Sequence, residues 1–342
     1  MTRASVFIPT SNRVDALRQC LDGLSRQSEK NFEVHVVGKR ADRDVKEMIE
    51  TYGSLDLKYH IQVRPGLVGA ANEILEDIAG ETFIRIDDDT VVEKDWLKNV
   101  VKTFEDFPDV GGVTGPTIMS DQGIQARDLT RYLDRFRRSR NGFLRALSRL
   151  YTDVLYEGKM LDVSLFLEGG VFTLGSNFES SKSIPGILDV TNLEACNWAC
   201  RTAVLRRMNG FDEIFSKGLG DYHEADGAFK IRCMGYRTVF NPGAALRHNV
   251  EIGKIEEARP ASFYRIQNFL IFYLRYFRID SPRRFFKVFL NVVLQNAYYA
   301  FKFVRTGKVG QLGAIPGTIV GLIRGLAQER NKCDLQPNRF CP

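Results

Sequence analysis

The first hundred residues alternate between two patterns of hydrophobic positions. Short apolar runs, the first of them at residues 4–9, are typical of buried strands. Each run is followed by a segment in which apolar residues recur every three or four positions, as Val14, Leu17 and Leu21 do, which is typical of one face of a helix. The pattern predicts strands at 4–9, 32–38, 57–63 and 81–87, and helices at 10–27, 42–53, 69–80 and 93–107.

This alternation indicates βαβ units built around a parallel sheet, in which ligands bind beyond the carboxyl ends of the strands. The fourth predicted strand ends there in three adjacent carboxylates, Asp87, Asp88 and Asp89. Such neighbours repel one another unless a cation or strong hydrogen bonds compensate. Mg²⁺ and Mn²⁺ prefer oxygen ligands and are often held by carboxylates together with substrate phosphates. The cluster therefore indicates a metal–diphosphate site, and the structural alternative is a turn that caps the next helix.

A second group of polar residues opens a predicted helix at 223–235. Glu224 and Asp226 lie in its first turn, where carboxylates suit the helix dipole, and Glu224 is also well placed to act as a general base. A strand and a turn follow and lead to His248. That histidine is either structural or one nitrogen ligand of an oxygen-rich metal site.

These motifs resemble glycosyltransferase family 2. The resemblance implies an α/β protein with the GT-A-type nucleotide-diphospho-sugar transferase fold, a mixed, mainly parallel central sheet flanked by helices. It also implies inverting transfer of a sugar from a nucleotide-diphosphate donor to an acceptor. Four segments carry it in family-like order and cover most of residues 4–250: 6–27, 64–90, 196–215 and 223–248.

The resemblance also implies roles for individual residues. Asp87 and Asp88 would contact the nucleotide or the metal, and Asp89 and His248 would hold Mg²⁺ or Mn²⁺ on the diphosphate. Glu224 takes the position of the catalytic base. Asp226 matches the last acid of the same motif, whose first position, often Glu in the family, is His223. Positions that match the donor pocket are Pro9, Thr10, Asn12, Arg13, Arg64, Gly69 and Asn72.

The implied chemistry agrees with these residue types. A metal on the diphosphate would stabilise the leaving charge, and a carboxylate would take the proton of the acceptor hydroxyl. A single displacement inverts the anomeric carbon without a covalent intermediate. The sequence departs from the family at Gly38 and Lys39, which stand where many members have acids that read the nucleobase.

Two other functions compete with this interpretation. A nucleotidyltransferase also uses carboxylates, a metal and a nucleotide, but usually has a Gly-rich basic loop near its start, which residues 9–16 are not. A non-catalytic sugar-nucleotide sensor or scaffold would keep the fold without the chemistry. The intact Asp87, Asp88, Asp89 and Glu224 argue against that second alternative.

The charge of the chain is unevenly distributed. The 342 residues carry a net charge of +6, yet residues 261–330 contain eleven Lys or Arg and only two Asp or Glu, interleaved with aromatic residues. This composition suits helices that lie in a membrane interface, while Lys287 and Asn291 argue against a spanning helix. The apolar run at 312–323 is too short to span. A lid that packs on the catalytic domain and a homodimer surface are the alternatives, and nucleic acid is not an expected partner because no nucleic-acid-binding signature is present.

The expected organisation is a catalytic domain at 1–255, an amphipathic helical region at 256–330 and a tail at 331–342. An insertion at about 123–185 flanks the acceptor side. Within it, residues 127–149 hold eight Arg against two Asp, which indicates a solvated helix or a surface for lipid phosphate or membrane headgroups. Without a signal peptide, we expect a cytoplasmic protein, peripheral at the cytoplasmic face of the membrane, with a lipid-linked or polysaccharide acceptor.

Overall fold

The described part of the chain leaves out only a few segments. The structure, a computed structural model, describes all residues except 1–2, 12, 120–124, 250–261 and 329–342. Asn12, which the sequence places in the donor pocket, therefore lies outside the described residues, as does the expected tail.

The chain divides into two compact units. Most of the segment expected as an insertion in the catalytic domain, up to Gly175, belongs to the same unit as the C-terminal helices. The first unit comprises Met1–Gln122, Ser176–Ser216 and His223–Val250, and the second comprises Gly123–Gly175, Lys217–Tyr222 and Glu251–Pro342.

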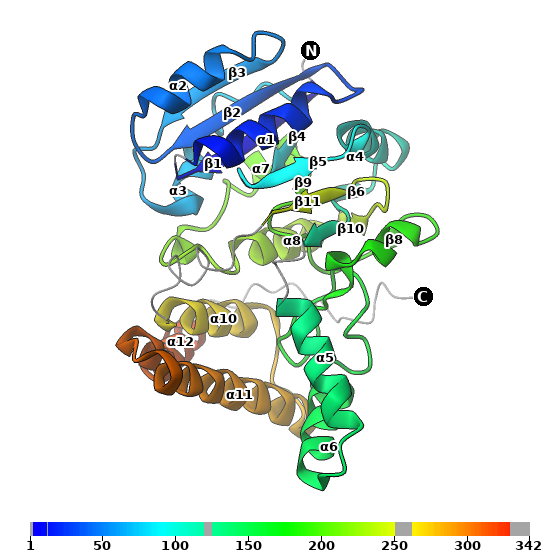
Figure 1. Cartoon of the computed structure of the whole chain (residues 1–342), viewed down its shortest axis with the longest axis vertical. Coiled ribbons are helices and arrows are strands. Elements are labelled where there is room, and N and C mark those ends of the chain that lie inside the picture. Colours follow the sequence, from blue (N-terminus) through cyan, green and yellow to red (C-terminus); the bar gives the residue numbers. More distant parts are fainter. Residues whose placement is uncertain (1–2, 12, 120–124, 250–261, 329–342) are drawn as a thin grey trace. The chain divides into compact units, whose positions relative to one another are not determined.

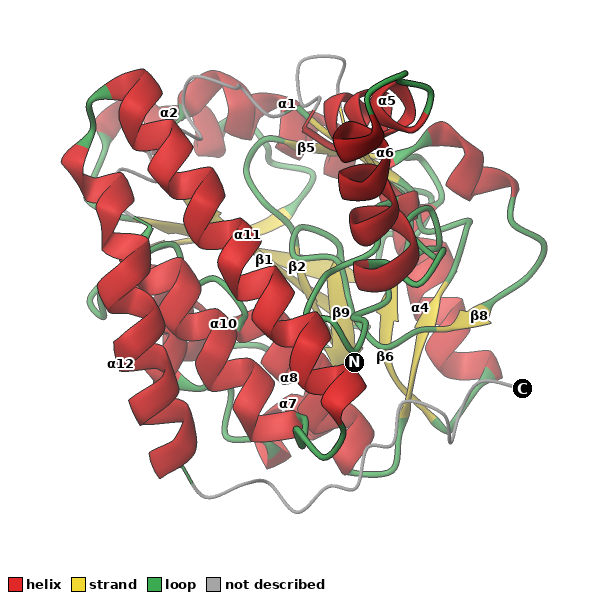
Figure 2. Ribbon diagram, turned by 90° about the horizontal axis from the view of Figure 1, so that it is seen from below, coloured by secondary structure: helices red, strands yellow, loops and turns green. Residues whose placement is uncertain are grey.

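Eight strands of the first unit form one mixed, mainly parallel sheet, as the alternating pattern predicts (Figures 1 and 2). Their order is β3-β2-β1-β4-β9-β6-β10-β8, with β9 antiparallel to both neighbours and β8 antiparallel to β10. The strands are β1 (Ala4–Thr10), β2 (Phe32–Gly38), β3 (Asp56–Ile61), β4 (Thr82–Arg85), β6 (Val110–Thr114), β8 (Leu188–Asp189), β9 (Trp198–Arg201) and β10 (Arg237–Phe240).

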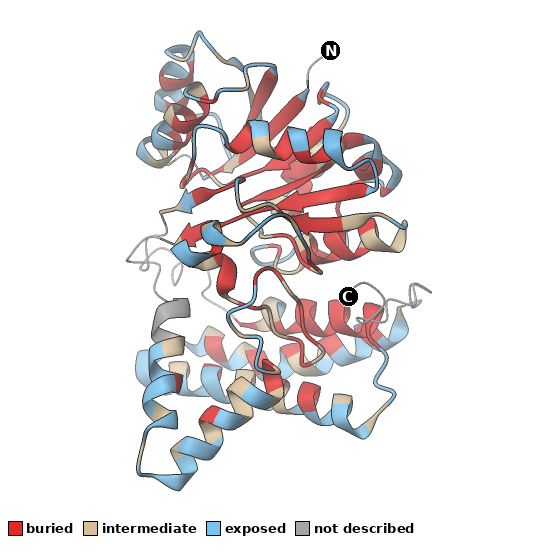
Figure 3. Ribbon diagram, turned by 90° about the vertical axis from the view of Figure 1, so that its right-hand side faces the viewer, coloured by how far each residue is buried: buried red, intermediate tan, exposed pale blue. Residues whose placement is uncertain are grey.

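Both faces of this sheet are buried (Figure 3). Successive side chains of a strand point to opposite faces. Val6 and Ile8 of β1 accordingly join one core cluster with Leu17 of α1, while Phe7 between them stacks on Phe83 of β4. The helices of this unit are α1 (Val14–Ser25), α2 (Arg43–Glu50), α3 (Gly66–Glu73), α4 (Trp96–Asp106), α7 (Thr202–Arg207) and α8 (His223–Cys233).

A second, three-stranded sheet lies at the point where the Asp cluster ends. It has β11 (Leu246–His248) between β5 (Thr90–Val92) and β7 (Thr117–Met119). The strand β11 runs antiparallel to β5, and the register pairs His248 with Thr90. The small sheet therefore brings the last strand of this unit beside the aspartates.

Helix α3 differs from the predicted helix at 69–80. The carboxylate of Glu73, its last residue, accepts a hydrogen bond from the backbone N–H of Val63 at 3.0 Å. Beyond it, the chain approaches β1 so closely that a Cβ on Gly80 would lie 2.5 Å from the backbone nitrogen of Ser5. The helix ends at Glu73, and residues 74–77 form turns before this approach.

The second unit is helical in the segments with regular structure. Its first part forms a helical hairpin, and its C-terminal part forms three longer helices (Figure 2). The helices are α5 (Gln125–Arg137), α6 (Gly142–Arg149), α10 (Phe263–Tyr276), α11 (Pro282–Thr306) and α12 (Ala314–Ala327), together with the π-helical turn η1 (Leu150–Leu155) and the 3₁₀ turn η5 (Val309–Gly313).

Helix α12 packs on α10 through glycines spaced four residues apart. A Cβ on Gly317 would lie 2.5 Å from the carbonyl oxygen of Phe263, and one on Gly321 would lie 2.9 Å from Cα of Gln267. Only residues without a side chain allow two helix backbones to approach so closely. The opposite face of α12 leaves its isoleucines and leucines exposed.

One helical stretch among the described residues, Val309–Ala327, has the length and apolar composition of a membrane span. The sequence had indicated a run too short for this, at 312–323, but η5 continues into α12 and lengthens it to 19 residues. Core helices of soluble proteins can have the same length and composition.

Candidate active site

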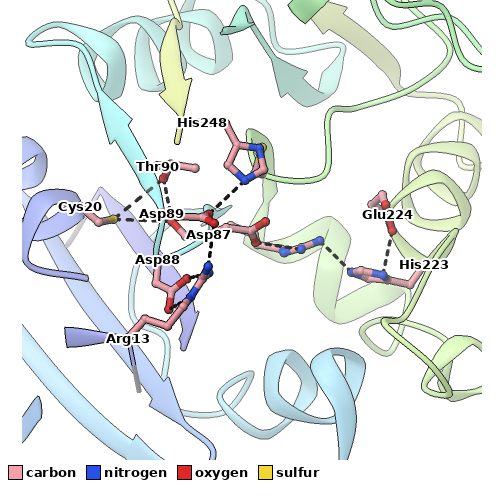
Figure 4. Close-up of polar contacts among 11 residues, drawn as sticks. Arg13, Cys20, Asp87, Asp88, Asp89, Thr90, His223, Glu224 and His248 are labelled. Atoms are coloured by element: carbon pink, nitrogen blue, oxygen red, sulfur yellow. Dashed lines mark hydrogen bonds and ion pairs between the residues drawn. The ribbon is translucent and has the colours of Figure 1, made fainter. Parts of the chain in front are cut away.

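The three aspartates occupy the turn between the main sheet and the small sheet (Figure 4). Strands β1 and β4 are parallel neighbours, so their carboxyl ends meet. Thr10 at the end of β1 donates a hydrogen bond from Oγ1 to Asp88 Oδ2 at 2.6 Å. Arg13, at the start of α1, contacts both Oδ atoms of Asp88, and its Nη1 lies 2.9 Å from Asp89 Oδ2. One guanidinium thus serves two buried carboxylates.

Burial and neighbouring charges shift the pKa values of this cluster in opposite directions. Burial raises the pKa of Asp88, although the hydrogen bonds and charge of Arg13 work against it. For Asp89, burial is outweighed by His248 and Arg13, so its pKa falls below the usual value. Burial would lower the pKa of Arg13, but the two carboxylates raise it. Arg13 therefore keeps its proton and holds Asp89 ionised.

His248 approaches the cluster from β11. Its Nε2 lies 3.0 Å from Asp89 Oδ1, and its Nδ1 lies 3.3 Å from the sulfur of Cys196. Burial lowers the pKa of His248, but Cys196 and Asp89 outweigh burial and raise it well above the usual value. The pairing of β11 with β5, rather than any nearby sequence, determines this position.

The arrangement fits a divalent cation. Oδ1 of Asp89 is buried, and Nε2 of His248 lies 3.0 Å from it. Donor atoms of Asp87, Cys196 and His248 all lie within 4.8 Å of one another. Carboxylate oxygens and an imidazole are ligands that Mg²⁺, Mn²⁺ and Zn²⁺ accept in proteins. The side chains of Asp87 and His248 can therefore hold a metal here, and Asp89 lies beside them at Nε2 of His248.

A line of polar contacts connects the Asp cluster to Glu224 (Figure 4). Nη2 of Arg85 donates to Asp87 Oδ1 at 3.1 Å, and Nη1 of Arg85 lies 3.0 Å from His223 Nε2. His223 Nδ1 in turn lies 2.8 Å from Glu224 Oε2. The first turn of α8 carries both His223 and Glu224. The line joins the expected base to the expected metal site.

Glu224 is held in its ionised form. Burial by itself would raise its pKa, but the charge and hydrogen bond of His223 and the charge of Arg85 outweigh burial and hold the pKa at about 2. The Nε1–H of Trp198 also donates to the backbone carbonyl of Glu224 at 3.1 Å, which ties the start of α8 to β9.

Other residues expected at the site have different neighbours. Asp226 is buried, and its Oδ2 lies 3.0 Å from Nζ of Lys230 on the same helix. The side-chain amide of Asn72 exchanges two hydrogen bonds of 2.8 Å with the backbone of Phe211. Gly69 lies against Arg64, where a Cβ would come within 2.8 Å of the arginine Cβ.

Arg64 and Asn72 line a cavity of about 810 Å³ in the first unit. Lys230 and the chain around Phe211 also line it. Pro9 is half-buried in β1, one residue before Thr10. Of the residues expected at the site, Thr10, Arg13, the aspartates and His248 therefore meet at one cluster, while Arg64 and Asn72 line the cavity.

Two residues of this region escaped the sequence reasoning. Arg85 is 3% exposed, and its only signal is a charged residue inside the apolar run before the aspartates. Cys196 belongs to no CxxC pair, so no spacing rule singles it out. Both become visible only when β4, β9 and β11 are brought together.

Comparison with known proteins agrees with this geometry. Residues 5–160 match the family described as Glycosyl transferase family 2. This part of the chain is therefore similar to glycosyltransferase family 2. The match confirms the resemblance stated from the sequence motifs and covers the Asp cluster.

A curated relative matches beyond this region. The chain is 24% identical over 197 residues to the dolichyl N-acetyl-alpha-D-glucosaminyl phosphate 3-beta-D-2,3-diacetamido-2,3-dideoxy-beta-D-glucuronosyltransferase of Methanococcus voltae. The match covers 52% of this chain and 60% of the relative. Matches to two other glycosyltransferases span 15% and 31% of those proteins, so each match covers only part of the relative.

Two solved structures show the fold. Mannosyltransferase PcManGT from Pyrobaculum calidifontis, in complex with GDP-Man and Mn²⁺, matches with a TM-score of 0.52 and 18% identity, over 95% of this chain and 87% of that one. S. aureus TarS 1-349 with UDP-GlcNAc matches with a TM-score of 0.56 and 16% identity, over 95% and 80%. The chain therefore has the expected GT-A-type fold.

Proposed function

We propose that this chain is a metal-dependent, inverting glycosyltransferase that moves a sugar from a nucleoside-diphosphate donor to a hydroxyl or phosphate of a glycan or lipid-linked acceptor. The observation that carries the proposal is the meeting of Asp87, Asp88, Asp89, Arg13 and His248 at the carboxyl ends of β1 and β4. In open α/β sheets this is the edge at which ligands bind.

The donor would lie at this cluster. Asp89 and His248 would hold Mg²⁺ or Mn²⁺, and Asp87 and Asp88 would contact the nucleotide or the metal. The cation supplies charge stabilisation of the leaving diphosphate when it is bound. Arg13 keeps the two buried carboxylates in place, because its guanidinium contacts both. Other proposed donor contacts are Pro9, Thr10, Arg64, Gly69 and Asn72, and Asn12 by sequence alone.

Glu224 would act as the general base. Its low pKa keeps it ionised at neutral pH, and His223 holds its carboxylate. A carboxylate can take the proton of an acceptor hydroxyl as the hydroxyl attacks the anomeric carbon. Attack from the face opposite the leaving group inverts that carbon. Asp226, paired with Lys230, would support the same helix.

The second unit would face a lipid surface. Helix α11 exposes Phe285, Phe289 and Phe301, and the chain around them is rich in Arg and Lys. Apolar side chains interleaved with cations suit the interface of an anionic membrane. The name of the M. voltae relative describes a dolichyl-linked phosphate as its acceptor. This supports a lipid-linked acceptor for this chain.

A thermal-shift screen tests the donor site. Purified protein is melted with nucleoside diphosphates and nucleotide sugars, each with and without Mn²⁺ or Mg²⁺. A ligand at 100 times its dissociation constant adds about 2.7 kcal/mol to the stability of the folded state. We expect metal-dependent stabilisation by one nucleotide series, lost in Asp89→Ala. Product analysis then separates the competing functions.

Three outcomes of product analysis are distinct. Release of a nucleoside diphosphate with an inverted glycoside supports the proposal. Release of pyrophosphate indicates a nucleotidyltransferase. Tight donor binding without transfer or hydrolysis over a broad acceptor panel indicates a sensor or scaffold.

A further inference from the structure

Cys196 is placed rigidly beside His248. The next residue, Asn197, accepts a hydrogen bond of 3.0 Å from Nε1 of Trp96 and donates one of 2.9 Å to the carbonyl of Ala244. Its own carbonyl accepts from Thr114 Oγ1 at 2.8 Å. These contacts fix the backbone just before β9 and so the position from which the cysteine side chain projects. Its side chain is almost fully buried.

The distances suit a shared metal. Donor atoms of Asp87, Cys196 and His248 lie within 4.8 Å of one another, and sulfur and Nδ1 are 3.3 Å apart. Two ligands of a tetrahedral centre, with metal–sulfur and metal–nitrogen bonds of about 2.3 and 2.1 Å, are about 3.6 Å apart. A cation can enter between these atoms after a shift of a few tenths of an ångström.

The second nitrogen of His248 strengthens this geometry. A metal-binding histidine usually directs its other ring nitrogen to a carboxylate or carbonyl, which fixes the ring. Here Nδ1 faces Cys196 while Nε2 faces Asp89 at 3.0 Å. Oδ1 of Asp89 thereby orients the imidazole, and Nδ1 is the nitrogen presented toward the sulfur. Asp87 is the carboxylate whose oxygen lies within 4.8 Å of both donor atoms.

We propose that the Cys196 thiolate is a direct ligand of the cation that the Asp cluster and His248 hold, which gives this centre one sulfur donor. The inference rests on the proposed metal site and adds a residue that neither the family match nor the sequence motifs assign. On binding, a metal–sulfur bond forms and the thiol proton passes to water. Because thiolate favours softer cations, the centre prefers Co²⁺, Zn²⁺ and Cd²⁺ over Mg²⁺.

Cobalt absorption spectroscopy tests the sulfur ligand directly. The full chain is titrated with Co²⁺, and the near-ultraviolet thiolate-to-cobalt charge-transfer band is recorded. We expect this band in the wild type and its loss in Cys196→Ser. We also expect at least about tenfold weaker Co²⁺ binding in the variant, or about 1.4 kcal/mol. Cys200→Ser is the matched control, because Cys200 is also a buried free thiol on β9.

The outcomes separate the two proposals. Binding of Mn²⁺ by calorimetry without a cobalt–thiolate band in the wild type overturns the sulfur ligand and leaves the metal site standing. Persistence of the band in Cys196→Ser assigns it to another cysteine and also overturns the inference. No binding of Co²⁺ or Mn²⁺ overturns both proposals. If the variant does not fold, X-ray absorption of the wild-type Co²⁺ complex decides whether sulfur is bound.

Discussion

At the scale of single residues, the pKa values of the carboxylates in the candidate site depend on two opposing effects, burial and neighbouring charges. Asp88, Asp89 and Glu224 would all have raised pKa values from burial alone. For Asp89, His248 and Arg13 reverse that effect, and for Glu224, His223 and Arg85 do, so both carboxylates stay ionised at neutral pH. For Asp88, the effect of burial exceeds that of Arg13, so its pKa is raised. Three carboxylates in one region therefore differ in basicity because their partners differ.

Glu224→Gln removes the proposed base while keeping the shape of the side chain. We expect turnover to fall by about 10²–10⁴-fold, because general-base catalysis contributes that much, while donor affinity and thermal stability stay near wild type. Steady-state kinetics and donor titration measure both. Glu105→Gln, an exposed carboxylate on α4, is the matched control. Wild-type turnover in Glu224→Gln would falsify the assigned role.

The pH dependence of the same step follows from the pKa of Glu224. Since the pKa is held at about 2, the carboxylate is not protonated when the pH falls from 7 to 5. We therefore expect no loss of turnover from this group in that range.

At the scale of elements, buried polar groups join strands in addition to apolar packing. Glu33 of β2 is 1% exposed. It accepts hydrogen bonds from Ser5 of β1 at 2.5 Å, from Lys58 of β3 at 2.7 Å and from the backbone of Ala79 at 2.6 Å. One carboxylate thus connects three neighbouring strands and the turn before β4. Burial by itself would raise its pKa, but these bonds outweigh burial and lower the pKa to about 2.

Glu33 makes the stability of the folded state sensitive to acid. Its pKa is lower in the folded than in the unfolded chain, so its stabilisation is present above about pH 4.5 and is lost as the pH falls toward 2. The shift corresponds to about 3 kcal/mol at neutral pH. We expect Glu33→Gln to lose stability at pH 7 and to show a flatter pH dependence between about pH 5 and 3 than the wild type.

Urea unfolding over this pH range measures the effect. Glu47→Gln is the matched control, because Glu47 on α2 is exposed and pairs only with the exposed Arg43 in the described structure. Exposed pairs of this kind contribute little. Equal pH dependence of wild type and Glu33→Gln would contradict the assignment.

At the scale of the whole molecule, the chain combines an α/β unit that carries the candidate site with a helical unit that exposes apolar and basic residues. Four glycines allow α12 to pack on α10, which leaves the isoleucines of α12 facing outward. Segments distant in sequence, 123–175 and the C-terminal helices, build this second unit together. Among the described residues, none packs over the exposed apolar side chains of this unit.

Liposome flotation tests the proposed membrane surface. We expect the wild type to float with vesicles that contain anionic lipid and to float less with zwitterionic vesicles or at high salt, because salt screens the attraction of Lys and Arg to the surface. The triple variant Phe285→Ser, Phe289→Ser and Phe301→Ser should lose binding without loss of donor affinity. Val63→Ser, an exposed apolar residue of the first unit, is the control.

Two results would contradict a membrane role. The triple variant could bind vesicles as well as the wild type does, which would place the contact elsewhere. The wild type could remain unbound and form a dimer that the triple variant disrupts in sedimentation. That outcome would assign the apolar face of α11 to a second copy of the chain.

The sequence by itself determined the first four strands, the helices that alternate with them and half of the site. Alternation of apolar runs and helical spacing identified β1, β2, β3 and β4 of the main sheet, because those patterns depend only on neighbours along the chain. The position of the Asp cluster followed from the end of an apolar run, and the family motifs added Glu224 and His248.

Only the tertiary structure decided which of these residues meet. Arg85 and Cys196 lacked a local signal, and α3 ends at Glu73, before the end that the apolar spacing predicted. The contact of His248 with Asp89 depends on the pairing of β11 with β5, between segments far apart in sequence. Local hydrophobic spacing carries no information about such pairings, since they arise from packing of the whole unit.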